Sequence, residues 1–340
     1  MKKQLFMEKP FITSYPTHAN TLSSVSQFPQ SFEWYYENYV QIFARPTRGN
    51  SYVNFYVPYP WRACPFFSYC DIPREIINAY INDITIFLNS TIDHNYYVLM
   101  YLDRFYISKS GDYGRYHMGH DTLIFGYDNE LKQYNVADFY DGQYQQVLVP
   151  FNEIQEAYNS TQYPKDICDD FNGIVLYKIQ ECSWYKFDIL RYKRNIQTFL
   201  EGIRGDALPS YGYKTHNFTH PDEYVYGINV FQYLKEYLKR MEAENNNFID
   251  FRGFHFLYDH IRMAVRTVDF LEGKGYMQSY SVIQKKLREL EKKITILRNK
   301  ILKKNIISNA PKNFTEQLLQ LLSEVADQEI EVFGLIYSSL

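Results

Sequence analysis

The sequence predicts an α+β protein with an N-terminal half rich in strands and a helical C-terminal half. Runs such as YYVLMYLDRFYI (residues 96–107) are rich in the β-branched and aromatic residues typical of strands. After about residue 183, apolar residues recur instead with the helical period of about 3.6. A chain of 340 residues is long enough for two domains, which we place at residues 1–183 and 184–340.

Individual elements of the N-terminal half follow from local patterns. Residues 20–44 carry apolar residues at helical spacings, and SYVNFYVPYPW (51–61) alternates before two prolines, which predicts a short strand and a loop. Asp71 is expected to cap a helix that begins at Pro73 and continues through EIINAYINDITIFLNS. FNGIVLYKIQ (171–180) supplies another strand.

The C-terminal half is predicted to end in a helical hairpin. An apolar seam at coiled-coil spacing covers residues 283–301. Within residues 281–305 there are nine Lys or Arg and two Glu, whereas the helix that follows Asn313 is acidic. Glu316 completes a capping box with Asn313. Two helices of opposite charge would pack on each other as an antiparallel hairpin; a basic face for an acidic partner protein and a dimeric coiled coil are the alternatives.

Composition excludes several classes of function. A net charge of −3 gives no overall attraction to nucleic acid. The N-terminal residues lack the apolar core of a signal peptide, and no window approaches the roughly 18 apolar residues of a transmembrane helix. The four cysteines show no C-x-x-C spacing, which predicts reduced thiols and no metal site. We therefore expect a cytoplasmic protein without a nucleic-acid or membrane partner.

The most informative stretch is HDTLIFGYDNELKQYNVADFYDG (120–142). Its DNE tripeptide indicates a turn between two strands. If the turn is centred on Asn129, paired residues have numbers that sum to about 258, which sets His120 opposite Asp138. A carboxylate there would accept the proton of one imidazole nitrogen and leave the other nitrogen as a base. The alternative is a purely structural hydrogen bond, and a slip of one residue would separate the two side chains.

Several motifs together resemble a family of papain-like cysteine enzymes. They are HDTLIFGYD followed by NVADFYDGQY and VPFNEI, and in the second half YGINVFQYL (226–234) and FIDFRGFHFLYDH (248–260). Over residues 13–270 the chain resembles the bacteriocin-leader-peptidase-like group, and within it the N-terminal domain of butirosin biosynthesis protein H and its relatives. The resemblance implies a papain-like cysteine-protease fold, in which a helix packs on an antiparallel sheet, with a C-terminal helical region.

The same resemblance implies an amide-forming acyltransferase of specialised-metabolite, thiotemplated peptide biosynthesis. The acyl group would leave the phosphopantetheine thioester of an acyl or peptidyl carrier protein, pass to an enzyme cysteine and end on a small-molecule amine. The expected partners are therefore that carrier protein and the amine acceptor. The enzyme itself would need no cofactor, because the partner carries the phosphopantetheine. A cysteine peptidase or hydrolase is the alternative.

The family pattern places a cysteine in a short H-C-N-like segment that enters the first helix. The matching segment here is HAN (18–20), so Ala19 occupies the nucleophile position. Three explanations remain open: a cysteine-to-alanine replacement, a nucleophile elsewhere in the chain, or a catalytically dead substrate-binding homologue. Cys70 is the first alternative nucleophile, because the dipole of the helix capped by Asp71 would lower its pKa. Cys64 is the second.

Other candidate site residues surround these positions. His18 and Asn20 flank residue 19 and are candidates for supporting an oxyanion, and the backbone N–H groups of residues 19–20 could supply part of an oxyanion hole. Five residues are candidates for binding a polar substrate such as an amine, against ordinary capping, ion-pair or core roles: Asp250, Arg252, His255, Tyr116 and Tyr140.

Overall fold

A computed structural model describes residues 1–160, 173–205, 220–278, 280–306 and 313–340. These residues form two compact units. The sheet unit comprises residues 1–31 and 59–185, and the helical unit comprises residues 32–58 and the described residues after 185. Residues 32–58, which the sequence assigned to the N-terminal domain, thus belong to the helical unit.

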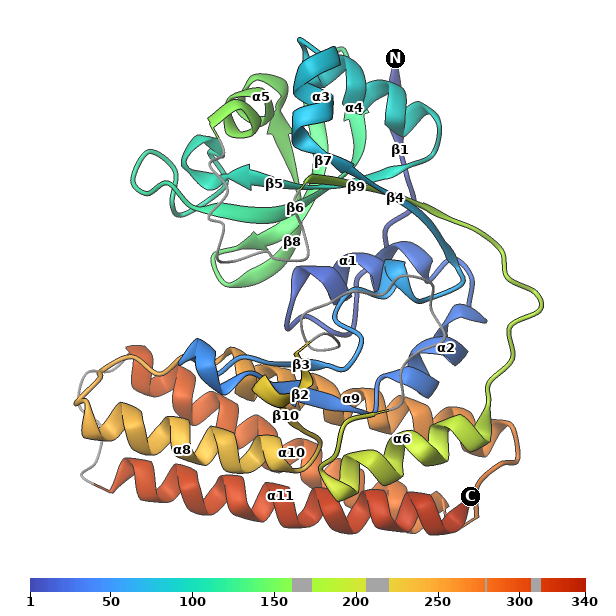
Figure 1. Ribbon diagram of the computed structural model, residues 1–340, viewed down its shortest axis with the longest axis vertical. Helices are drawn as coiled ribbons and strands as arrows, with labels where there is room; N and C mark the ends of the chain where they lie inside the picture. The colour runs from blue at the N-terminus through green and yellow to red at the C-terminus, as the bar shows by residue number, and fades with distance from the viewer. Residues whose placement is uncertain (161–172, 206–219, 279, 307–312) are drawn as a thin grey trace. The chain divides into compact units, whose positions relative to one another are not determined.

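The sheet unit is built on a seven-stranded antiparallel sheet with the order β4-β9-β5-β6-β7-β8 (Figure 1). β1 pairs with the far part of β6, beyond the end of β5. The strands are β1 (Lys2–Gln4), β4 (Phe67–Pro73), β5 (Tyr97–Asp103), β6 (Gly119–Asp128), β7 (Gln133–Tyr140), β8 (Gln143–Pro150) and β9 (Gly173–Ile179).

Helices cover both faces of this sheet. α3, α4 and α5 lie on one face and α1 on the other (Figure 1). The helices and 3₁₀ turns of the unit are α1 (Pro16–Val25), η2 (Pro60–Arg62), α3 (Arg74–Tyr80), α4 (Ile84–Asp93), η3 (Arg104–Tyr106) and α5 (Phe151–Ser160). The main core forms where apolar side chains of α3, α4 and α5, such as Leu88 and Ile154, meet sheet residues such as Met100 and Val136.

The predicted helix from Pro73 onward is wrong in two respects. Asp71 does not cap a helix, because it lies within β4 and pairs there with Val175. The helix is also divided into α3 and α4: Ile81 has an extended backbone, and the side chain of Asp83 accepts a hydrogen bond from the backbone N–H of Thr85. Asp83 is therefore the residue that caps a helix here.

The turn between β6 and β7 is not centred on Asn129. Asp128 pairs with Gln133. The side chain of Asp128 accepts hydrogen bonds from the backbone N–H groups of Glu130 (2.9 Å) and Leu131 (3.0 Å), which closes a longer loop than the predicted turn. The predicted register is therefore wrong at this end of the hairpin.

A β-bulge then shifts the register once more. Gly126 pairs with Asn135, but Ile124 pairs with Val136, so Phe125 is an extra residue on β6. An alanine Cβ at Gly126 would lie 2.7 to 2.9 Å from the side chain of Asn135 and the backbone of β1, so only glycine fits between the two neighbouring strands. Beyond the bulge, the numbers of paired residues such as 124 and 136 sum to 260.

The two shifts keep the predicted neighbours together. The sum of 260 differs from the predicted 258 by an even number, so His120 and Asp138 remain on one face and become diagonal neighbours. Without the bulge the sum would be the odd number 261, and the two side chains would point to opposite faces.

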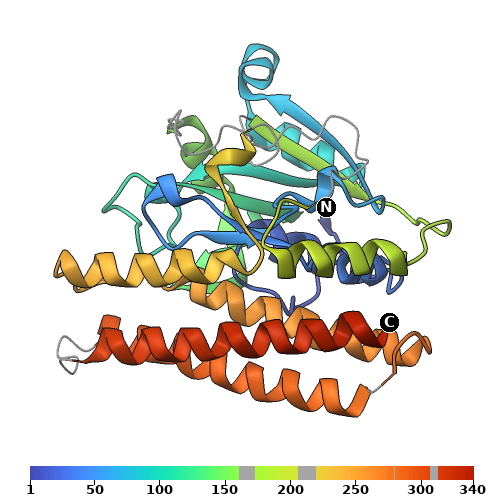
Figure 2. The same ribbon diagram turned by 60° about the horizontal axis from the view of Figure 1, so that its bottom comes forward.

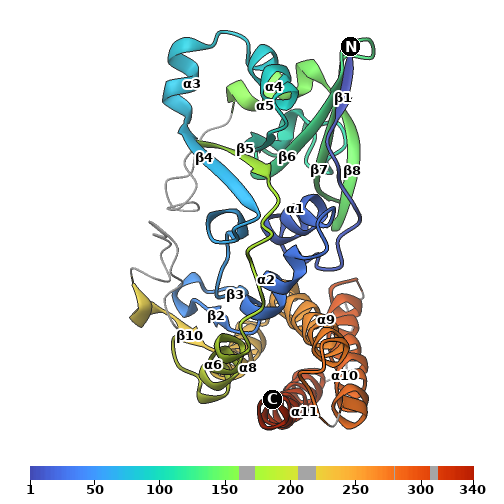
Figure 3. The same cartoon turned by 90° about the vertical axis from the view of Figure 1, so that its right-hand side faces the viewer.

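The helical unit combines a small sheet with long helices (Figures 2 and 3). Its three strands have the order β10-β2-β3. The elements are α2 (Ser31–Asn38), β2 (Ile42–Ala44), η1 (Pro46–Arg48), β3 (Val53–Phe55), α6 (Ile189–Glu201), η4 (Pro221–Glu223), β10 (Val225–Tyr226), α8 (Asn229–Ala243), α9 (Arg252–Gly273), α10 (Tyr280–Ile306) and α11 (Phe314–Ser339). Within the described stretches, none of the helices combines the length and apolar content needed to cross a membrane.

The predicted antiparallel hairpin of opposite charge is confirmed by α10 and α11, which run side by side (Figure 2). Lys286 forms an ion pair with Glu331 at 2.8 Å, and Lys293 forms one with Glu324 at 2.9 Å. The residues of the predicted seam are buried: Ile283, Leu287, Leu290, Ile294, Leu297 and Ile301. Part of the positive charge of α10 is thus paired with acidic side chains of α11.

Candidate active site

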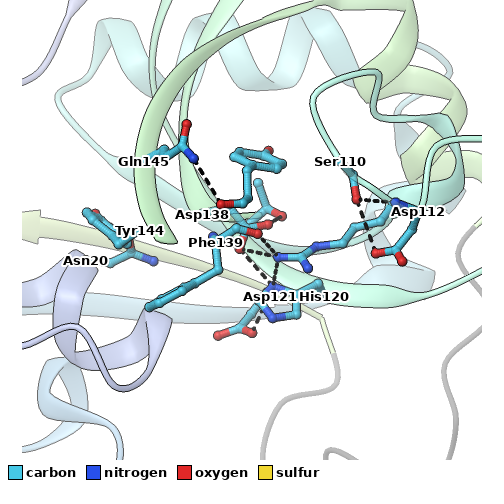
Figure 4. A network of polar contacts seen from close by, with 12 residues as sticks. Asn20, Ser110, Asp112, His120, Asp121, Asp138, Phe139, Tyr144 and Gln145 are labelled. Carbon is cyan, nitrogen blue, oxygen red and sulfur yellow. Dashed lines mark hydrogen bonds and ion pairs between the residues drawn. The ribbon is translucent and has the colours of Figure 1, made fainter. Parts of the chain in front are cut away.

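The centre of the candidate site is the His120–Asp138 pair, here called the dyad (Figure 4). Nδ1 of His120 lies 2.9 Å from Oδ1 of Asp138, and the side chains are 21% and 1% exposed. The hydroxyl of Thr122 donates to Oδ2 of Asp138 at 2.8 Å, and the backbone N–H of Phe139 donates to Oδ1 at 2.6 Å. The carboxylate is thereby fixed in one orientation.

Arg104, in η3, is a third charged member of the site that the sequence analysis missed. Its Nη2 donates to Oδ1 of Asp138 at 2.8 Å and to the carbonyl oxygen of Phe139 at 2.7 Å, and lies 3.0 Å from Nδ1 of His120. Nη2 carries two hydrogens, and both have an oxygen acceptor. Nδ1 is therefore the donor to Asp138, and Nε2 is the nitrogen that can take up a proton. An adjacent Asp–Arg pair at residues 103–104, within an otherwise apolar and aromatic segment 96–107, was the available signal.

The charges of the site shift the pKa values of both members of the dyad. Burial lowers the pKa of His120, but the charge and hydrogen bond of Asp138 and the charge of Asp121 outweigh it and raise that pKa overall, against the opposing charge of Arg104. Burial acts to raise the pKa of Asp138, yet His120, Arg104 and the Phe139 amide hold it below its usual range. An ionised carboxylate beside an imidazolium is thus favoured.

Residue 19 lies in the first turn of α1. Ala19 is fully buried, and its backbone N–H donates to the carbonyl of Tyr15 at 3.0 Å. The expectation that this amide contributes to an oxyanion hole is therefore wrong, because its hydrogen is already used within the helix. His18 is also buried, and its ring lies edge-on to that of Tyr15 at 6.3 Å, which indicates a packing role.

Asn20 connects α1 to the sheet. Its Oδ1 accepts a hydrogen bond from the hydroxyl of Tyr144 at 2.8 Å, and the Tyr144 ring lies edge-on to Phe139, the neighbour of Asp138 (Figure 4). Asn20 is only 1% exposed, yet among the described residues its Nδ2 has no hydrogen-bond partner. A buried N–H without an acceptor costs about 1–3 kcal/mol, so Asn20 is the candidate for an oxyanion donor that a ligand would satisfy.

Strand alternation places the dyad and α1 on opposite faces of the sheet. His120 pairs with Leu102, whose side chain belongs to the core under α3, α4 and α5. Tyr144 points to the other face, where it contacts α1. His120 therefore lies on the face of the sheet that α3, α4 and α5 cover, whereas Asn20 and Tyr144 lie on the face of α1, and the β6–β7 ladder ends at the Leu123–Ala137 pair.

Neither alternative nucleophile is favoured by its surroundings. Cys64 is buried, and burial raises the pKa of its thiol well above the usual range, which disfavours a thiolate. Cys70 is exposed on β4 and has no helix dipole to activate it, because Asp71 continues the strand. Two strands separate β4 from β6, which puts the two strand axes roughly 14 Å apart, and Cys70 is in line with Ile124 and not with His120, so it lies farther than that from the dyad.

The tyrosines proposed for substrate binding differ in their surroundings. Tyr116 is exposed on the loop before β6. Tyr140 is buried in the core under α5, and the guanidinium carbon of Arg104 lies 5.8 Å from its ring centre. Tyr140 is therefore a core residue and not a pocket wall, because alternation along β7 turns it toward the same face as Val136.

The remaining binding candidates lie in the helical unit. Asp250 and Arg252 form an ion pair at 2.9 Å at the start of α9, and Asp250 also accepts a hydrogen bond from the backbone N–H of Ser51. Although burial acts to raise the pKa of Asp250, Arg252 holds it below its usual range. Nδ1 of His255 lies 3.4 Å from a guanidinium nitrogen of Arg298. These contacts give Asp250 and Arg252 the capping and ion-pair role.

The described residues thus include an oriented base on one face of the sheet and, on the other, a buried amide donor and a helix that carries alanine at the nucleophile position. Cys168 lies outside the described residues. No group of three His, Cys, Asp or Glu side chains that could hold a metal ion occurs in the described part of the chain. No protein-family model matches the chain, and no curated protein matches it.

Proposed function

We propose that the protein has the architecture of a papain-like acyltransferase, in which residue 19 is the position of a nucleophilic cysteine. It would move an acyl group from a carrier-protein thioester to an amine. The observation that carries the proposal is the dyad, in which a buried carboxylate orients an imidazole and leaves Nε2 as a base. The chain order of helix, histidine strand and aspartate strand supports the same assignment.

The reaction would proceed in two balanced halves. Nε2 of His120 takes the proton of a thiol at residue 19, the thiolate attacks the thioester carbonyl, and the carbon–sulfur bond to phosphopantetheine breaks. The imidazolium returns its proton to the departing thiolate. An amine then attacks the acyl-enzyme, Nε2 takes the proton of the amine, and the enzyme thiolate leaves. Because aminolysis of a thioester is downhill, no ATP is consumed.

Acyl loading of the Ala19→Cys protein tests this assignment. After incubation with an acyl-loaded carrier protein, intact mass spectrometry is expected to show the added acyl mass on the Ala19→Cys protein. The parent chain is the matched control, because it retains every native cysteine and differs only at residue 19. An adduct of equal yield on the parent chain, or none on the variant, would remove residue 19 from the mechanism.

The buried amide of Asn20 gives a second prediction. In the Ala19→Cys protein, Asn20→Ala is expected to lower kcat by about 10²- to 10³-fold with little change in KM, because an oxyanion donor acts in the transition state. Steady-state amide formation measures both constants. Tyr144→Phe is the matched control: it removes the hydroxyl on Oδ1 but leaves Nδ2 in place, so its loss should be smaller. An unchanged kcat in Asn20→Ala would exclude this role.

The alanine at residue 19 favours a second candidate function for this chain, in which it binds a loaded carrier protein without turnover. Ala19 offers no nucleophile, burial disfavours a thiolate at Cys64, and two strands separate Cys70 from the strand of His120. Such a protein should bind a loaded carrier protein in calorimetry yet form no amide. An assay of the Ala19→Cys protein also distinguishes a peptidase from an acyltransferase. A peptidase would release a free acid from a peptide whether or not an amine is present.

A further inference from the structure

Hydrogen bonds hold the backbone around Arg104 in place, and its side chain extends from there into the site. Its N–H donates to the carbonyl of Met118 at 2.8 Å. The side chain of Asp103 accepts the next N–H, that of Phe105, at 3.0 Å and so caps η3. The side chain of Arg104 is 10% exposed and ends among the dyad, beside the ring of Tyr140.

The guanidinium of Arg104 is only partly satisfied by hydrogen bonds. Nη2 makes both of its bonds within the site, to Asp138 and to the Phe139 carbonyl. Nε is buried and, within the described ranges, has no acceptor. A buried charged donor without an acceptor is a sign that a site is arranged for another purpose.

The charge balance of the dyad indicates that purpose. Asp138 is a carboxylate buried away from water, and such a group requires a counter-charge. His120 can supply one only while it is protonated. Arg104 is charged at every relevant pH, so it compensates Asp138 when the imidazole has given its proton away.

We propose that Arg104 is a positioning residue that holds Asp138 and keeps its charge compensated, so that His120 can alternate between its neutral and protonated forms. The charged groups that face the imidazole are Asp138 from β7, Asp121 from β6 and Arg104 from η3. The two aspartates favour the imidazolium, and Arg104 is the cation that opposes them. The inference rests on the proposed function only in giving His120 the role of a base.

Two substitutions separate the charge of Arg104 from its geometry. Arg104→Gln keeps an N–H donor for Asp138 and removes the charge, so the pKa of His120 is expected to rise. Arg104→Lys keeps the charge and removes the planar fork, so that pKa should stay closer to the parent value. The measurement is a ¹H–¹⁵N NMR titration of the His120 ring in the chain with Ala19, which needs no turnover. Arg115→Met, at an exposed arginine of the preceding loop, is the matched control.

The direction of the shift decides the outcome. An unchanged or lowered pKa of His120 in Arg104→Gln would overturn the proposal, and so would loss of the fold in both variants, which would leave Arg104 a purely structural role. In the Ala19→Cys protein, Arg104→Gln should lose more than about tenfold activity near pH 6 and recover at high pH, because only the neutral imidazole accepts a proton. A loss that is equal at every pH would contradict it. If the Ala19→Cys protein takes up no acyl group but the pKa of His120 still rises in Arg104→Gln, only the proposed function is overturned.

Discussion

His120→Ala in the Ala19→Cys protein is expected to lower kcat for amide formation by about 10⁴- to 10⁶-fold. The thiol and the attacking amine would both lose the base that takes their protons. Because His120 is only diagonal to Asp138 and lies at the start of β6, removing its ring should leave the sheet folded. Steady-state kinetics of amide formation measures the loss.

A matched control lies three residues earlier in the chain. His117 also contacts a buried carboxylate, with its Nδ1 2.7 Å from Oδ2 of Asp103, but its side chain is 64% exposed on the loop before β6. His117→Ala therefore removes a second histidine of a His–Asp pair without touching the dyad. Equal losses in the His117 and His120 variants would show that neither imidazole is specific to the reaction.

The Asp138→Asn variant tests the charge of the carboxylate by itself, because the hydrogen-bond donors around Asp138 converge on one of its oxygens. The backbone N–H of Phe139 and Nη2 of Arg104 both donate to Oδ1 of Asp138, so the amide oxygen of asparagine should occupy that place. The amide nitrogen would then face Thr122, whose hydroxyl can accept. The imidazole keeps its orientation and loses only the carboxylate charge, so the pKa of His120 should fall and kcat should drop less than in His120→Ala.

The dyad could be predicted from the sequence although its register could not. A turn signal and two β-rich runs are local features, and they were sufficient to bring His120 near Asp138. The loop length depends on the hydrogen bonds of the Asp128 side chain, and the bulge depends on packing between strands. The prediction held because the error in the register was even, so the two side chains kept a common face.

Long-range contacts account for most of what the sequence did not reveal. Residues 32–58 join the helical unit because β2 pairs with β10, whose Tyr226 faces Phe43 from far along the chain. Arg104 follows directly after β5, in η3, and its role depends on two residues of β7. Periodicity describes which face a residue occupies, but not which distant charge it meets there.

The helical unit contains a fully buried His–Glu contact whose loss should have the largest effect on stability. Nδ1 of His260 on α9 lies 2.8 Å from Oε1 of Glu329 on α11, and both side chains are at most 1% exposed. Nε2 of His260 lies 2.8 Å from the carbonyl oxygen of Val40, which can only accept, so Nε2 carries a proton. The rings of Phe199 and Phe333 lie 5.4 and 5.6 Å from the imidazole and exclude water.

Glu329→Leu is expected to reduce the free energy of unfolding by about 1–3 kcal/mol, because it leaves a buried imidazole nitrogen without a polar neighbour. Urea-induced unfolding followed by circular dichroism measures the change, and Glu329→Gln should lose less because its amide oxygen can still face Nδ1. Adding His260→Phe to Glu329→Leu removes both polar groups from an aromatic surrounding, so the double variant should recover much of the loss. If the double variant is instead less stable than Glu329→Leu by the full effect of His260→Phe alone, the two residues act independently. The contact between His260 and Glu329 would then contribute nothing, and the bond from His260 to Val40 would be the interaction that joins α9 to the segment before β2.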